Sequence, residues 1–149
     1  FFVLRAWCFV MSIERFEDIE GWQLARRLTN DVYDVVSQGD FARDFGLKDQ
    51  ITRAAGSAMH NIAEGFDGGS NTEFAKFLRY AQRSCTEVKS QLYVALDRRY
   101  ITQAQFDHIY EVADKTHAKV GAFIRYLLTT IPKRASTKHQ ARSTRNSSP

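Results

Sequence analysis

The chain has 149 residues, a formal net charge of +4 and only two cysteines. This length is typical of one domain and is enough to bury a full hydrophobic core. Cys8 and Cys85 form no C-x-x-C pair and have no metal-type spacing to a histidine, so neither a disulfide framework nor a zinc site is indicated. This cysteine usage favours a reducing cytoplasm.

The first 15 residues are expected to be a leader outside the folded domain. Their apolar part, Phe1 to Val10, is about half of the ~20 residues that a membrane span needs, so no membrane segment is predicted. Residues 12–15 follow it where a signal peptide would place a small-residue cleavage site. Met11 is therefore interpreted as the natural start, with the residues before it an upstream extension. A weak signal peptide is the alternative.

Residues 16–131 are expected to form the folded domain, because their apolar residues repeat with the helical period and no segment alternates with a period of two. The first helix is predicted from about Ile19 to Ser37, with Gly39 placed to end it. The second helix includes residues 47–61. The predicted core positions of these two helices are Trp22, Ala25, Leu28, Val32 and Val35, then Leu47, Ile51, Ala54, Ala58 and Asn61.

Two longer helices follow, the third from Asn71 to about Arg99 and the fourth up to residue 131, where Pro132 stops it. Each begins with a capping box, formed by Ser70 with Glu73 and by Thr102 with Gln105. Their predicted core positions are Phe74, Leu78, Ala81, Cys85, Val88, Leu92 and Ala95, then Phe106, Tyr110, Ala113, His117, Val120, Ile124 and Leu127. Four amphipathic helices with short loops predict an all-α fold, the antiparallel up-and-down four-helix bundle.

Further apolar residues lie beside these core positions and widen the apolar face of the third and fourth helices. They are Phe77, Tyr80, Tyr93, Leu96, Ile109, Phe123 and Leu128. Two interpretations stay open, a thick core filled with aromatic side chains or an interface between subunits.

The stretch NIAEGFDGGS, residues 61–70, is interpreted as the end of the second helix and the turn into the third. Gly65 is predicted to adopt the left-handed backbone that ends a helix. No Gly-Lys-Ser or Gly-Lys-Thr follows these glycines and no strand precedes them, so the stretch has neither the phosphate-loop motif nor the dinucleotide fingerprint.

Arg53, Asn61 and Glu64 are predicted to serve structure or assembly. Asn61 continues the core positions, and a buried amide without partners costs about 1–3 kcal/mol, so we expect it to bond to loop carbonyls. Arg53 and Glu64 are eleven residues apart, close to three turns, and therefore share a helix face. Each is expected to pair with another helix or another subunit.

No catalytic residue, metal or cofactor is predicted. A di-iron site in a bundle needs paired Glu-x-x-His elements, whereas His60 precedes Glu64 by four residues and is better explained as an ion-pair partner on the same face. His117 is interpreted as a core or interface histidine, and Cys85 as a small buried hydrophobic residue. The chain is therefore predicted not to be an enzyme.

The run from Gln50 to Leu92 resembles the proteins encoded within intervening sequences of bacterial 23S ribosomal RNA genes, the S23 family. The matching elements are Phe16-Glu17-Asp18-Ile19, Trp22-Gln23, Gln50-Ile51, Arg53-Ala54-Ala55, Asn61-Ile62-Ala63-Glu64-Gly65, Glu73-Phe74 and Phe77-Leu78. The resemblance implies a four-helix bundle that assembles as a homopentamer, without established enzymatic activity and with a link to RNA. A more distant resemblance is to the RNA-binding accessory proteins of diversity-generating retroelements.

Two groups of basic residues support the hypothesis of RNA binding. The third helix has Lys76, Arg79, Tyr80, Arg83 and Lys89, a pattern in which cations contact phosphates and a tyrosine stacks on a base. Residues 132–149 are predicted to be a disordered basic tail with no acidic residue. The tail contains Lys133, Arg134, Lys138, Arg142 and Arg145, which leaves the rest of the chain close to a net charge of −1. A scaffold that binds a protein partner without nucleic acid is the alternative.

Overall fold

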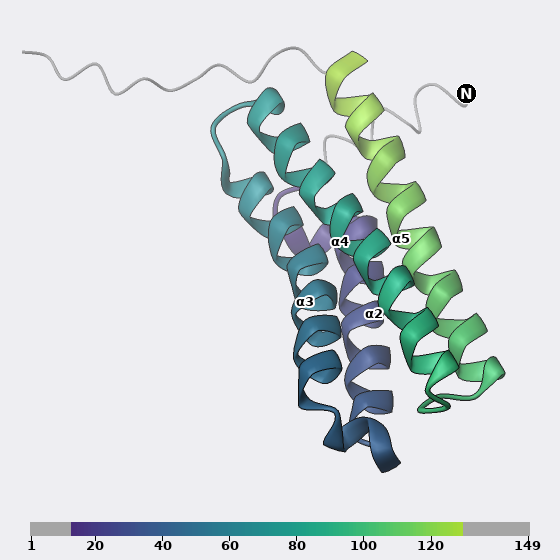
Figure 1. The fold of residues 1–149 in the computed structure, drawn as a ribbon. Coiled ribbons are helices and arrows are strands. Elements are labelled where there is room, and N and C mark those ends of the chain that lie inside the picture. The colour runs from purple at the N-terminus through teal and green to yellow at the C-terminus, as the bar shows by residue number, and fades with distance from the viewer. Residues whose placement is uncertain (1–12, 130–149) are drawn as a thin grey trace, which may run out of the picture.

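The four long helices run alternately up and down and pack side by side (Figure 1). The computed structural model describes residues 13–129. Its helices are α2 (Glu20–Val36), α3 (Phe45–Asp67), α4 (Asn71–Asp97) and α5 (Gln103–Thr129), with short 3-10 helices η1 (Phe16–Asp18) and η2 (Gly39–Arg43). α2 and α4 each pack against both α3 and α5. The predicted all-α, antiparallel four-helix bundle is confirmed, and the described residues contain no strand.

The predicted core positions of α2 and α4 are all buried, because helical spacing directs them toward the bundle axis. In α4 these seven side chains include Phe74, Leu78 and Leu92, each at most 2 % exposed. In α5, Thr116 is buried where His117 was predicted, and His117 itself is half-buried. The fully buried Phe41 of η2, which the periodicity did not indicate, closes one end of the core.

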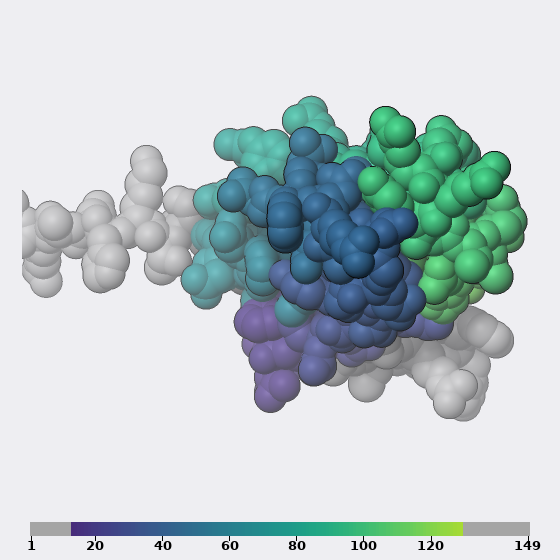
Figure 2. All heavy atoms as spheres, turned by 60° about the horizontal axis from the view of Figure 1, so that its bottom comes forward, coloured from purple at the N-terminus to yellow at the C-terminus, as the bar shows by residue number. Residues whose placement is uncertain are grey.

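Polar side chains cap the first turns of α4 and α5, at the two ends of the bundle. The capping box before α5 is confirmed, since the Thr102 N–H donates to Gln105 Oε1 at 2.9 Å and the Gln105 N–H donates to Thr102 Oγ1 at 3.1 Å. Ser70 Oγ likewise accepts from the Glu73 N–H at 3.1 Å. At the end of the bundle opposite Ser70, η2 and the start of α3 lie beside the α4–α5 connection (Figure 2).

The prediction for Gly65 is wrong, because this residue lies inside α3 and the helix ends at Asp67. Among the described glycines only Gly39 has a positive φ, of 51°. A Cβ on Gly65 would lie 2.7 Å from Phe77 Cβ and 2.8 Å from Phe74 Cδ2, both on α4. Gly65 is therefore required for the close approach of two helices, not for a left-handed turn.

Asn61 was also placed wrongly as a core position. Ile62 is fully buried in its place, four residues after Ala58, while Asn61 is half-buried at the side of α3. The cause is the spacing of the helix, which alternates gaps of three and four residues and allows either position to continue the pattern.

Most of the additional apolar residues thicken the core. Ile109 is 1 % exposed, and Phe77, Tyr80, Leu96 and Phe123 are half-buried. Tyr93 and Leu128 remain exposed, at 51 % and 48 %. The interpretation as a thick core therefore applies to the five buried or half-buried residues. The interpretation as a subunit interface stays open for Tyr93 and Leu128.

None of the described helices is long and apolar enough to cross a lipid bilayer. The leader up to residue 12 and the tail predictions, including the five tail cations, lie outside the described residues.

Candidate functional site

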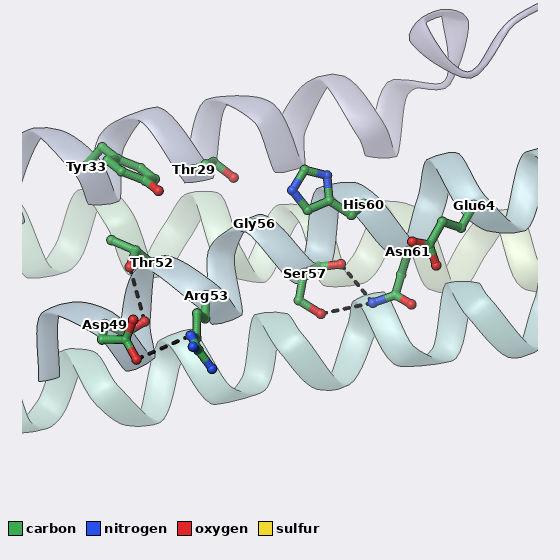
Figure 3. Close-up of a pocket in the computed structure, with 10 residues that line it drawn as sticks. All are labelled: Thr29, Tyr33, Asp49, Thr52, Arg53, Gly56, Ser57, His60, Asn61 and Glu64. Carbon is green, nitrogen blue, oxygen red and sulfur yellow. Dashed lines mark hydrogen bonds and ion pairs between the residues drawn. The ribbon is translucent and has the colours of Figure 1, made fainter. Parts of the chain in front are cut away.

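The outer face of α3 is hollowed beside α2 (Figure 3). The hollow has a volume of about 530 Å³. It brings together Arg53, Asn61 and Glu64, because these residues repeat at helical spacing along one side of α3. Gly56 lies between them and leaves room where a side chain would project. The other lining residues are Thr29, Tyr33, Asp49, Thr52, Ser57 and His60.

Asn61 makes its contacts within α3 and not with loop carbonyls as predicted. Its Nδ2 donates to the Ser57 carbonyl and to Ser57 Oγ, both at 2.9 Å. Ser57 Oγ also accepts from Ser84 Oγ of α4 at 3.0 Å. Asn61 therefore holds the Ser57 hydroxyl against α4, which is a structural role at the α3–α4 contact.

Arg53 and Glu64 share the predicted face, but Arg53 has its partner on its own helix. Arg53 Nε lies 3.2 Å from Asp49 Oδ2, and both side chains are well exposed. Exposed pairs of this kind stabilise a helix only weakly, by about 0.3–0.5 kcal/mol. Within residues 13–129, Glu64 forms no ion pair within 4 Å, and the expected pair with His60 is not formed.

The hollow has no arrangement that would activate a nucleophile. The Ser57 hydroxyl is engaged by Asn61 and Ser84, and no carboxylate or histidine of residues 13–129 forms a hydrogen bond with it. Cys85 is buried in the core, and burial raises the pKa of its thiol to about 12, so it stays protonated at neutral pH. In the part of the chain that the structure describes, no three His, Cys, Asp or Glu side chains are grouped to hold a metal ion.

A second surface is formed by the predicted basic residues on the outer face of α4. Lys76 Nζ and the Arg83 guanidinium each lie 5.9 Å from the centre of the Tyr80 ring, on successive turns of the helix. Arg79 lies on the same exposed face. We call Lys76, Arg79, Tyr80 and Arg83 the α4 patch. No carboxylate of residues 13–129 lies within 4 Å of its three cations.

Lys89, which was predicted with this group, lies elsewhere. It is about 120° around the helix from Arg83, as six residues at about 100° each dictate. Its Nζ donates to Asp114 of α5 at 3.0 Å and lies 5.3 Å from the Tyr110 ring, and only 18 % of its side chain is exposed. The hydrogen bond to Asp114 is the main cause that raises the pKa of Lys89. Lys89 therefore joins α4 to α5 and is not part of the patch.

The α4 patch places three cations without an ion-pair partner among residues 13–129 together on one helix face, whereas several other cations of the bundle are paired. Arg27 pairs with Asp31, Lys115 with Glu111 and Lys119 with Glu20. These pairs neutralise three cations of α2 and α5. The α4 patch keeps its positive charge available to an external anion.

Four residues that line the α3 hollow were not predicted from the sequence, namely Thr29, Tyr33, Gly56 and Ser57. The signal was present in the adjacent small residues Gly56 and Ser57 on an otherwise polar helix face. It was not decisive, because small residues on a helix also serve close helix packing, as Gly65 does.

The family of this chain follows from its match to a family model. The family model described as 23S rRNA-intervening sequence protein matches residues 17–122. The chain belongs to this family. The matched segment includes both the α3 hollow and the α4 patch, and it confirms the resemblance to the S23 family.

A solved structure supports the fold of this intervening-sequence protein. It is the crystal structure of a protein of unknown function from the S23 ribosomal protein family of Bacteroides thetaiotaomicron, with a TM-score of 0.61. The two chains are 23 % identical, and the match covers 70 % of this chain and 94 % of the other. At this identity the likeness shows the shared fold alone. No curated protein matches the chain.

Proposed function

We propose that this intervening-sequence protein is a non-enzymatic, oligomeric bundle that associates with RNA as an accessory factor in the cytoplasm. The observation that carries the proposal is the α4 patch. Two of its three cations, Lys76 and Arg83, lie 5.9 Å from the centre of the half-buried Tyr80 ring, and no carboxylate of residues 13–129 lies within 4 Å of any of the three. Cations that follow a phosphate backbone, next to a ring on which a base stacks, are the usual elements of sequence-tolerant binding to single strands.

The charge distribution supports a local site and argues against binding by the whole surface. The net charge is +4, but five cations lie in residues 133–145, so the remainder is close to neutral. Long-range attraction of RNA by the bundle as a whole is therefore weak. Binding requires a local cluster, which the α4 patch and the tail both provide.

Self-association is the second element of the proposal, with a ring of five copies as the expected assembly. Tyr93 and Val94 of α4 are 51 % and 46 % exposed, which is unusual for large apolar side chains next to each other. Five copies would present the α4 patch five times, and linked contacts of modest strength combine into a higher overall affinity.

A scaffold for a protein partner is the alternative function, and one observation favours it. Phe45, the first residue of α3, is 77 % exposed at the end of the bundle where η2 lies. A projecting aromatic residue of this kind is typical of contacts between proteins.

Titration of a fluorescent single-stranded RNA tests the proposal directly. The full-length chain is compared at low salt with the variant Arg79→Ala/Arg83→Ala and with a matched control, Arg98→Ala/Arg125→Ala. Each variant loses two exposed arginines that form no ion pair within residues 13–129. We expect about a tenfold loss of affinity for the first variant and less than a twofold change for the control. RNA binding absent from the full-length chain would leave the scaffold as the function.

A further inference from the structure

A second groove lies where α3 ends, beside the segment that leads into η1. Its volume is about 430 Å³. The apolar side chains of Phe16, Ala63 and Phe66 line it, and each of them is partly buried against the core. We call this the end groove. The other lining residues are Glu14, Arg15, Glu17, Glu64 and Asp67.

The electrostatics of the end groove favour a cationic occupant. Four carboxylates line it, and Arg15, the one cation among the lining residues, is paired with Glu17 at 3.5 Å. The last turn of α3 contains no basic residue. The negative end of a helix dipole is normally matched by cations, yet here it is joined by Glu64 and Asp67. A cation placed in this groove would relieve the repulsion among these charges.

The chain itself supplies a segment of matching chemistry. Residues 133–145 contain five cations and no acidic residue. Cations such as Lys133 and Arg134 pair with carboxylates, and an arginine also stacks on an aromatic ring such as Phe16 or Phe66. The apolar lining and the carboxylates of the end groove therefore correspond to the two parts of a long basic side chain.

The point where the tail leaves the bundle also matches. α5 ends at Thr129, at the same end of the bundle as the α3–α4 connection (Figure 1). Asn71 Nδ2 donates to the Leu127 carbonyl at 3.3 Å, which joins the last turn of α5 to the first residue of α4. The 20 residues after Thr129 span up to about 66 Å when extended, whereas the 27 residues of α4 are about 40 Å long. The tail is long enough to reach the end groove on its own bundle.

We propose that the basic tail of this chain docks in the end groove of its own bundle. This contact involves no RNA and stands independently of the proposed function. If the chain also binds RNA, docking of the tail regulates that binding, because tail cations paired with Glu14, Glu64 and Asp67 are not available to phosphates. Docking then competes with RNA, and both weaken with salt because both are ionic.

Limited trypsin digestion of the full-length chain, without RNA and at low salt, tests the docking. Trypsin cleaves after Lys and Arg, so release of peptides from residues 133–149 reports how accessible the tail is. The variant Glu14→Gln/Glu64→Gln/Asp67→Asn removes three exposed carboxylates from the end groove. The matched control, Asp34→Asn/Asp97→Asn/Asp107→Asn, removes three exposed carboxylates toward the opposite end of the bundle. Circular dichroism verifies that both variants are folded.

We expect tail release from the end-groove variant to be at least threefold faster than from the wild-type chain and from the control variant. Added salt at 0.5 M should raise the wild-type rate toward that of the end-groove variant. Equal rates for all three proteins would overturn the proposal, and so would an equal acceleration in both variants, which would reflect net charge alone. Because no RNA is present, a failure of RNA binding leaves this result unaffected.

Discussion

Gly65 of α3 lies so close to Phe77 of α4 that a Cβ on the glycine would be only 2.7 Å from Phe77 Cβ. The same Cβ would lie 2.8 Å from the Phe74 ring. Phe77 Cβ is held by the α4 backbone and cannot move away without a shift of the helix. The glycine in the family motif is therefore explained by the contact between α3 and α4.

This contact predicts opposite effects for two glycine substitutions in the same helix. Gly65→Ala should lower the free energy of unfolding by about 1–3 kcal/mol, because overpacking forces the two helices apart. Gly56→Ala should raise it by about 0.4–1 kcal/mol, because alanine favours the helix and the nearest side-chain atom, His60 Nε2, is 3.6 Å away. Urea unfolding measures both. A Gly65→Ala protein as stable as the wild type would contradict the assignment.

Asp44 is predicted to stabilise the bundle through two contacts. Its Oδ1 accepts from the Leu47 N–H at 3.1 Å and caps α3, and its Oδ2 accepts from the Tyr100 hydroxyl at 3.1 Å. Asp44→Ala should therefore cost about 1–2 kcal/mol in unfolding free energy. Tyr100→Phe keeps the cap and should cost less. Equal costs in thermal or urea unfolding would show that the cap contributes nothing.

The Tyr100 bond also predicts a dependence on alkaline pH. The hydrogen bond to Asp44 is the main cause that raises the pKa of Tyr100 above its usual value near 10. A group whose pKa is raised by folding stabilises the folded state below its unfolded pKa, and this contribution is lost as the pH rises through the folded pKa. The stability difference between wild type and Tyr100→Phe should therefore be constant near neutral pH and shrink above about pH 10. A difference that grows with pH would contradict the bond.

Self-association is predicted to depend on α4 more than on α2. Tyr93 of α4 and Tyr33 of α2 are similarly exposed, at 51 % and 56 %. Tyr93→Lys should reduce the mass measured by light scattering from about five copies toward a smaller species, because it places a charge in the proposed apolar contact. Tyr33→Lys should leave the mass unchanged. A wild-type chain that is monomeric at every concentration would contradict the assembly.

The fold was accessible from the sequence because its main determinants are periodic. The core positions of α4 follow one unbroken pattern, and the caps at Ser70 and Thr102 are local signals. Gly65 was misjudged because its cause is a contact with Phe77, which lies twelve residues away and on another helix. A one-dimensional pattern does not distinguish a glycine needed for a turn from one needed for close packing.

The candidate site was only partly accessible for the same reason. Arg79, Tyr80 and Arg83 share a face by spacing alone, and the structure places them together. Lys89 belongs to the same helix but not to the same face, and its partner Asp114 is on α5. Asn61 bonds Ser57 within α3, but the bond from Ser84 to Ser57 depends on the register between α3 and α4, which the sequence does not specify.

The salt dependence of RNA affinity tests the central claim most directly, because it counts the phosphate contacts that we propose for the α4 patch. Affinity for a single strand falls with salt by about 0.7 logarithmic units per contact and tenfold change in salt concentration. The slope for Arg79→Ala/Arg83→Ala should therefore be shallower than that of the full-length chain by about 1.4, while Arg98→Ala/Arg125→Ala keeps the wild-type slope. Identical slopes and affinities for all three proteins would show that the α4 patch does not contact RNA.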